Sequence, residues 1–178
     1  MKILITSLVL LLCIQFSFSQ QVKLPAIKDK SSITYSMVHP LHKWDGVSRE
    51  VSSIILADAD RKVISQVAVS AKLSTFDSQN ANRDSHMLEV TEGIKFPNVT
   101  FSGNDIKQDG DQLTVKGKLT FHGITRDITF TATRRNEGKN LTVTGGFPVK
   151  MSDFNIPAPS LLGFATEDEF QIRFVVVY

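Results

Sequence analysis

Cysteine is almost absent from this sequence: the only one, Cys13, lies within the first 19 of the 178 residues. The chain from residue 20 onward therefore has no disulfide and no thiol chemistry. Lipid attachment to Cys13 is disfavoured, because the bulky Leu12 directly before it is a poor fit to a lipoprotein cleavage site. Stability must then come from one hydrophobic core, and a chain of this length buries enough apolar surface for a single domain.

Long apolar runs are also scarce, and the only marked one lies near the N-terminus, over residues 3–14. Lys2 precedes it and the small residues Ser17 and Ser19 follow it, which is the order of a secretory signal peptide. The run is too short to span a bilayer, which takes about 20 residues. We predict a cleaved signal peptide over residues 1–19, a lead-in over residues 20–31 and one domain over residues 32–178. We therefore expect a periplasmic or secreted protein without stable membrane insertion.

Charge of one sign is nowhere concentrated. The chain has 20 Lys and Arg residues against 18 Asp and Glu residues. Loss of Lys2 with the leader leaves a formal charge of +1. Nucleic-acid binding calls for a concentrated basic face, so we expect no nucleic-acid partner.

What the sequence does contain is period-two alternation of apolar and polar residues, from Ser32 to the C-terminus. This alternation is typical of strands that bury one face. In LTVKGKLTF, Leu113, Val115, Leu119 and Phe121 share a face, opposite lysine and threonine residues. Their shared face predicts an apolar interior.

Similar or weaker patterns occur at residues 33–38, 51–57, 63–73, 99–105, 128–132, 141–151 and 170–178. In the stretch 63–73, the alternation places Val63, Val67 and Val69 on the inward face. Polar turns such as DADRK, KQDGDQ and RNEGKN predict hairpins between antiparallel strands. About eight strands are expected, and closure into a barrel would remove their exposed edges. At that size the interior is either filled with side chains or holds one small ligand, and the pattern leaves both open.

The segment NANRDSHMLEVTEGIKFPN interrupts the alternation and is longer than a hairpin needs. We expect a short helical segment near residues 83–90 within it. Met87, Leu88 and Val90 would then close one end of the barrel.

The segment SDFNIPAPSLLGFATED is apolar but lacks strand periodicity. Exposure of Leu161, Leu162 and Phe164 to water would be unfavourable. We therefore expect this segment to fold over the sheet or into the mouth of the barrel.

The four histidines suggest a metal site as one alternative, since imidazole is a common zinc or copper ligand. His39 and His42 are three residues apart, a spacing that points two side chains of one strand to opposite faces. His86 and His122 lie far away in sequence. The pattern therefore favours turn residues over metal ligands.

A serine-type enzyme is a second alternative, in which Asp84 orients His86 beside Ser74 or Ser85. Such an enzyme needs a positioned nucleophile and an oxyanion loop, and neither a GxSxG elbow nor a Gly-rich loop occurs. A structural role is favoured, in which Arg83 and Asp84 hold the backbone of a long loop.

Four segments, taken in order, resemble the YceI-like family of bacterial proteins, which have a signal peptide and a lipocalin-like barrel. They are FDSQNANRDSHMLEV, KFPNVTFSG, GKLTFHGITRDITFTAT, and SDFNIP followed by EDEFQIRFVV; the likeness covers residues 32–178. One departure is HPLHKWDG, where Pro40, His42 and Trp44 replace a simpler strand leading to glycine. It bears on the identity of the ligand more than on the fold.

The resemblance implies an all-β, eight-stranded antiparallel lipocalin-like barrel with a short helical segment near residues 83–90. It also implies noncovalent binding of a long apolar lipid: a polyisoprenoid, an isoprenoid quinone or its precursor, or a fatty amide. No covalent catalysis is implied, and no cofactor other than the bound lipid. A homodimer is left open, as are the metal- or His/Asp-dependent enzyme and an envelope structural protein with a filled barrel.

If the barrel is hollow, its ligand should meet inward-facing aromatic residues, Met37 and residues of the two irregular segments. The predicted ligand-binding residues are Met37, Trp44, Phe76, Met87, Leu88, Phe101, Phe121, Phe130, Phe147, Phe154, Leu161, Leu162, Phe164 and Phe170.

Overall fold

The computed structural model describes residues 20–60, 63–161 and 163–178, so the predicted signal peptide lies outside the described residues. The strands are β1 (Gln21–Pro25), β2 (Ser32–His39), β3 (His42–Ser48), β4 (Val51–Asp58), β5 (Ile64–Lys72), β6 (Asn98–Asp109), β7 (Gln112–Phe121), β8 (Ile124–Glu137), β9 (Asn140–Lys150), β10 (Ser160–Leu161), β11 (Phe164–Ala165) and β12 (Glu169–Val177). The helices are α1 (Ala81–Val90) and the 3₁₀ helices η1 (Lys28–Lys30), η2 (Leu73–Thr75) and η3 (Ser152–Phe154). Among the described helices, none has the length and apolar character needed to cross a membrane.

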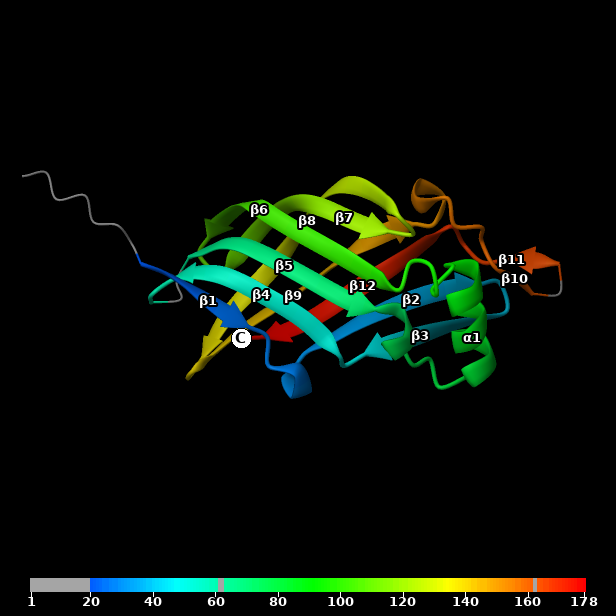
Figure 1. Ribbon diagram of the computed structural model, residues 1–178, viewed down its shortest axis with the longest axis horizontal. Helices are drawn as coiled ribbons and strands as arrows, with labels where there is room; N and C mark the ends of the chain where they lie inside the picture. The colour runs from blue at the N-terminus through cyan, green and yellow to red at the C-terminus, as the bar shows by residue number, and fades with distance from the viewer. Residues whose placement is uncertain (1–19, 61–62, 162) are drawn as a thin grey trace, which may run out of the picture.

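Ten strands form one antiparallel sheet in the order β1-β4-β5-β6-β7-β8-β9-β12-β2-β3. From β4 to β9 each strand pairs with its neighbour in sequence, whereas β12 pairs with both β9 and β2. Figure 1 shows the sheet curled about the long axis of the molecule, with α1 and the β10–β11 hairpin at one end. The last strand thus joins the early hairpin β2–β3 to the rest of the sheet.

Strands β1 and β3 are the edges of this sheet. Val47 of β3 forms an isolated bridge with Asp77, which follows η2. Ile27, just after β1, donates its N–H to the carbonyl oxygen of Val177 at 2.7 Å. These contacts enclose the inward face, although β1 and β3 do not pair with each other.

The prediction of an antiparallel, lipocalin-like all-β fold is confirmed, but the sheet has ten strands rather than eight. The alternation missed β1, which is five residues long and ends at Pro25, and β3, which reads HKWDGVS. The charged residues and glycine of β3 break the apolar pattern. The helical segment is also confirmed, and α1 begins at Ala81 because the side chain of Asn80 accepts a hydrogen bond from the Arg83 N–H.

The predicted inward position of Val63 is wrong: its side chain is 52% exposed, and Ile64 is buried in its place. The register between β4 and β5 shifts between Leu56 and Ala57, so Leu56 faces Gln66 whereas Ala57 faces Ile64. A β-bulge of this kind adds one residue to a strand and reverses the faces beyond it. An alternation of inward and outward residues that is extended from Val67 toward the N-terminus therefore predicts the wrong face beyond the bulge.

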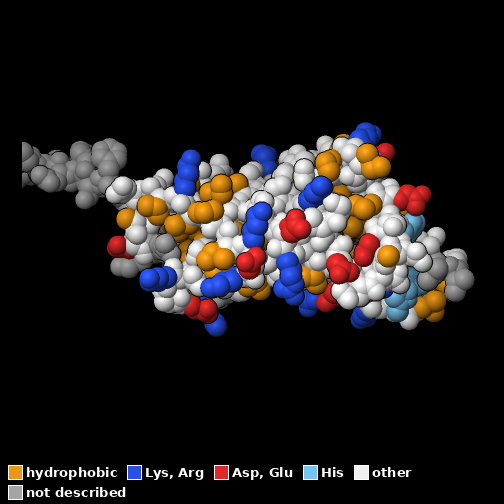
Figure 2. All heavy atoms as spheres, turned by 60° about the horizontal axis from the view of Figure 1, so that its bottom comes forward, with side chains coloured by type: hydrophobic (Ala, Val, Ile, Leu, Met, Phe, Trp, Pro, Cys, Tyr) orange, Lys and Arg blue, Asp and Glu red, His pale blue; other side chains and the backbone are white. Residues whose placement is uncertain are grey.

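The outer surface carries both signs of charge. Figure 2 shows Lys and Arg side chains interspersed with Asp and Glu along the visible face, with histidine gathered at the end of β10 and β11. The ion pairs on the outer strands are exposed, as in Lys118–Asp127 at 2.9 Å. Such pairs contribute little to stability, so the fold depends on its interior.

The C-terminal residue, Tyr178, is buried in the interior. Its backbone N–H and carbonyl oxygen both pair with Leu141, at 2.8 and 2.9 Å, and its hydroxyl lies 2.7 Å from the Ser53 hydroxyl. Burial raises the pKa of Tyr178 to about 12, with the Ser53 hydrogen bond opposing the shift. The neutral phenol is therefore the form that the fold stabilises.

We expect this burial to make stability fall at alkaline pH. A phenol whose folded pKa lies above its ordinary value of about 10 contributes fully below that value, and its contribution is lost as pH rises toward 12. Tyr178→Phe has no ionisable group at this position, so it should not show this loss. From about pH 10 to pH 12, the free energy of unfolding of the wild type should therefore fall relative to that of the variant by on the order of 1–3 kcal/mol. Urea denaturation from pH 8 to about pH 11.5 measures the difference, and a pH-independent value would contradict the prediction.

Candidate functional site

The curled sheet encloses a cavity of about 630 Å³. This volume falls within the range of roughly 300–1,000 Å³ that is typical of small-molecule sites. Aliphatic and aromatic side chains form most of its lining, and Arg83 is the only Lys, Arg, Asp or Glu among the described lining residues. The interior is therefore hollow and predominantly apolar.

Strand alternation supplies this lining. In β7, Leu113, Val115, Leu119 and Phe121 all reach the cavity, as the pattern predicted. Successive side chains of a pleated strand point to opposite faces, so each strand contributes every second residue. The interior therefore needs no special motif, only repeated alternation around the sheet.

Aromatic rings gather around Phe130 of β8. Its ring stacks on Phe147 at a centroid distance of 4.8 Å and lies 5.4 Å from Phe101 and 5.8 Å from Phe174. All four residues line the cavity. This cluster presents a broad aromatic surface to anything that occupies the interior.

The cavity brings together nine of the fourteen predicted residues: Met37, Trp44, Phe76, Met87, Phe101, Phe121, Phe130, Phe147 and Phe170. Two others pack elsewhere: Leu88 lies against the hydrophobic core, and Phe154 is a core residue whose ring is 5.6 Å from Phe121. Leu161 belongs to β10, and Leu162 lies outside the described residues.

The second irregular segment reaches the cavity through Ile156, Pro159 and Ser160, as expected, but not through Phe164. Its side chain is 53% exposed and is not among the lining residues. The β10–β11 hairpin that carries it extends beyond the end of the barrel (Figure 1). The hairpin is attached through its backbone rather than through the Phe164 ring. The Phe164 carbonyl oxygen lies 3.0 Å from Nε2 of the His39 side chain. Just after the hairpin, Glu167 donates its N–H to the carbonyl oxygen of Val38.

Polar lining residues come mainly from α1, the segment before it and the β2–β3 hairpin. They include His39, His42, Asn80, Asn82, Arg83 and His86, which the ligand-site prediction had omitted. The cavity therefore has an apolar body and one polar end. In the sequence, the signal for this polar end was the segment that interrupts the strand pattern and contains α1.

His39 and His42 are closer than a single strand would allow. A turn at Pro40 and Leu41 places them opposite each other in the β2–β3 register, with ring centroids 5.2 Å apart, and His42 stacks on Trp44 at 5.1 Å. The prediction of opposite faces is wrong because it assumed one continuous strand. In the described part of the chain, no group of three or more His, Cys, Asp or Glu side chains is placed to hold a metal ion.

The loop before α1 is fixed by Asp84. Its carboxylate accepts hydrogen bonds from the Ser78 N–H at 3.1 and 3.3 Å, which confirms the predicted structural role. His86 instead places Nδ1 3.4 Å from Glu89. Among the described contacts, then, Asp84 and His86 do not form an acid–base pair.

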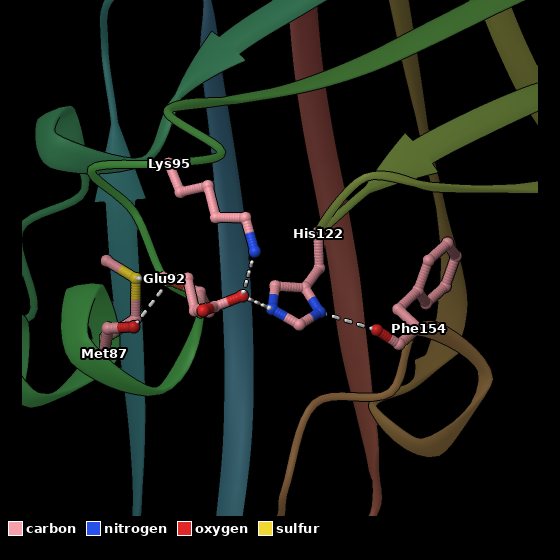
Figure 3. A network of polar contacts seen from close by, with 6 residues as sticks. Met87, Glu92, Lys95, His122 and Phe154 are labelled. Carbon is pink, nitrogen blue, oxygen red and sulfur yellow. Dashed lines mark hydrogen bonds and ion pairs between the residues drawn. The ribbon is translucent and has the colours of Figure 1, made fainter.

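The segment after α1 is held to the barrel by His122, in the β7–β8 turn (Figure 3). Its Nε2 lies 2.9 Å from the Glu92 carboxylate and its Nδ1 lies 2.9 Å from the Phe154 carbonyl oxygen. Both partners are acceptors, so both bonds form together only when both ring nitrogens carry protons. Lys95 lies 3.5 Å from the same Glu92 oxygen. This network, the His122 clamp, joins the α1 segment, the β7–β8 turn and η3.

A curled antiparallel sheet around an apolar cavity with one polar end is a lipocalin-like architecture. The model of the YceI-like domain family matches residues 26–178. This protein belongs to the YceI-like family. A UPF0312 protein of Pseudomonas fluorescens is 33% identical over 72% of this chain and 69% of its own, and Protein YceI of Salmonella newport is 26% identical over 70% of each chain.

Solved structures share the fold. BcnA of Burkholderia cenocepacia superposes with a TM-score of 0.77 at 21% identity, over 86% of this chain and 99% of its own. A polyisoprenoid binding domain from Saccharophagus degradans, implicated in plant cell wall breakdown, superposes with a TM-score of 0.72 at 13% identity, over 89% and 98% of the chains. At these identities the likeness establishes the architecture.

We expect His122→Asn to lower the free energy of unfolding by about 1–3 kcal/mol. Asparagine tolerates the left-handed backbone at this position (φ 49°), but its short side chain cannot bridge both acceptors. Urea denaturation at neutral pH measures the change. The matched control is His86→Asn, on the exposed surface of α1, which should change stability by less than about 0.5 kcal/mol. Equal losses in both variants would contradict the His122 clamp.

Proposed function

We propose that this protein binds a long apolar lipid noncovalently in its cavity, for carriage, storage or protection in the cell envelope. The ligand class is a polyisoprenoid, an isoprenoid quinone or its precursor, or a fatty amide. The observation that carries the proposal is the apolar cavity of about 630 Å³, whose described lining has a single charged side chain. The solved polyisoprenoid binding domain of the same fold supports it.

Burial of hydrocarbon supplies the driving force. Transfer of one five-carbon isoprene unit from water to an apolar interior gains about 3–4 kcal/mol, at ~0.8 kcal/mol per carbon. Ordering of the flexible chain and imperfect contact offset much of this gain. Several buried units are therefore enough for tight binding without any charged contact.

The same cavity favours binding over catalysis. Its interior presents apolar groups where an enzyme would need a positioned nucleophile and base. The predicted leader at residues 1–19 would deliver the protein outside the cytoplasm, where an envelope lipid is the available ligand. We accordingly propose a nonenzymatic protein whose only bound group is its lipid.

The direct test is native mass spectrometry of the mature protein purified from its own envelope. We expect an added mass in a ratio of one to one, and organic extraction should identify it as an isoprenoid or fatty lipid. Incubation of delipidated protein with isoprenoid quinones should restore the added mass. A protein that is ligand-free on isolation and takes up none of these lipids would contradict the proposal.

A cavity-filling variant tests the location. Val143 is half-buried and lines the cavity, so Val143→Phe should take space from the ligand. Loss of contact with about two carbons would weaken binding by ~1.6 kcal/mol, or roughly 15-fold, in a fluorescent lipid competition assay. The same change at Val175, which is 40% exposed and outside the lining, should leave affinity unchanged. Equal affinities for the two variants would place the lipid elsewhere.

A further inference from the structure

The cavity reaches solvent at the end of the barrel where α1 lies. The described lining residues that are exposed are His42, Asn80, Asn82, His86, Thr100 and Ser160. All except Thr100 come from the β2–β3 hairpin, the α1 segment or β10, and Figure 1 shows these elements together at one end of the molecule. This end is therefore the mouth through which a ligand in the cavity exchanges with its surroundings.

Two hairpin tips at this mouth carry exposed apolar side chains. Leu41, in the turn between β2 and β3, is 59% exposed, and Phe164 of β11 is 53% exposed. Leu41 directly precedes the lining residue His42, and Phe164 lies in the same hairpin as the lining residue Ser160. Figure 2 shows hydrophobic side chains beside the histidine at this end. Leu41 and Phe164 therefore lie at the edge of the mouth, and we call them the apolar rim.

One buried imidazole joins the two tips. His39 is only 3% exposed; its Nδ1 accepts the Leu41 N–H at 3.2 Å, and its Nε2 lies 3.0 Å from the Phe164 carbonyl oxygen. A neutral imidazole that accepts at one nitrogen carries its proton on the other, so Nε2 donates the second bond. The same ring thus fixes the backbones of both tips, and the apolar rim is a built feature of the mouth.

The charges near the apolar rim are mixed. Lys43 of β3 is exposed, and so are Glu167 and Asp168, which follow the β10–β11 hairpin. A surface of mixed charge does not strongly attract a partner of either sign. An exposed leucine and an exposed phenylalanine, by contrast, both gain free energy when a partner removes them from water. The interaction that this end offers is therefore apolar insertion.

A lipid bilayer is the partner that leaves the mouth usable. Because the cavity is apolar over most of its lining, a ligand that passes from it directly into the hydrocarbon of a bilayer avoids water. A second copy of the chain seated on the apolar rim would instead cover the mouth. Shallow burial of a few apolar side chains also gives reversible attachment, unlike a membrane-spanning helix.

We propose that the apolar rim is a membrane-docking surface. Leu41 and Phe164 insert into the border of the hydrocarbon layer and set the mouth of the cavity against a zwitterionic lipid surface, where the bound lipid is exchanged. This inference rests on the proposed function for its purpose, the exchange of a lipid. The docking itself is measured without any ligand in the cavity.

The first test is flotation of the delipidated mature protein with vesicles of pure phosphatidylcholine. Wild-type protein should float with the vesicles to the same extent at low and at high salt. Leu41→Ser and Phe164→Ser should each lower the partition coefficient about 5-fold, since about half of a large apolar side chain no longer leaves water. The double variant should lower it about 25-fold if the two effects add.

Val63→Ser is the matched control. Val63 is 52% exposed, and it directly precedes β5, which begins at the opposite end of the molecule from α1 (Figure 1). This substitution removes a similar exposed apolar side chain away from the mouth. It should leave the partition coefficient unchanged.

Transfer of a fluorescent isoprenoid quinone between two vesicle populations is the second readout. The double variant should slow protein-dependent transfer at least about 10-fold, because less of it is docked at any time. Its affinity for the same probe in solution should equal that of the wild type, since neither Leu41 nor Phe164 is among the described lining residues. Val63→Ser should transfer the probe at the wild-type rate.

The outcomes separate docking from lipid binding. Docking is overturned if wild-type protein does not float, if the rim variants float like wild type, or if flotation needs anionic lipid and is lost at high salt. A wild-type dimer in light scattering that the double variant loses would make a second copy the occupant and would also overturn it. Protein that floats but takes up no quinone contradicts the lipid-binding proposal and leaves docking in place.

Discussion

The pleat of the β-strand is the constraint on which this structure depends. Each strand commits alternate residues to the interior, so a curled sheet with apolar inward positions encloses an apolar volume. Most of the interior is built this way, by residues such as Leu113, Val115 and Phe130. The outward positions are free to carry charge, and they do so with both signs mixed (Figure 2). The two-residue period of the strands therefore sets both the polar character of the outer face and the apolar character of the cavity.

The polar end of the cavity is held by different forces. Helix α1 contains no buried residue, so apolar packing alone does not fix its position. Asn80 caps its start, Asp84 binds the loop before it, and the His122 clamp fastens the segment after it. Directional contacts of this kind set an orientation that hydrophobic burial leaves loose. The polar lining residues of α1, such as Asn82 and Arg83, owe their position to this framework.

The sequence allowed much of the fold to be predicted because strand alternation is a local signal. It identified β7, β9 and β12 and most of the aromatic lining, including Phe101 and Phe147. It failed where three-dimensional pairing decides the outcome: at the bulge that exposes Val63, and at the turn that brings His42 opposite His39. The polar end of the cavity was also beyond local reasoning, because Trp44 and Arg83 come together only through the fold.

The charged residues that break the apolar pattern of β3 also affect how two molecules of this protein interact. An exposed sheet edge is a template on which another chain can add a strand, and natural proteins protect such edges with inserted charges. Strand β3 carries Lys43 and Asp45, and Asp45 pairs with Arg173 of β12 at 2.7 Å. At the other edge, β1 is short and ends at Pro25. The irregularity of both edge strands thus guards a largely β-sheet protein against edge-to-edge aggregation.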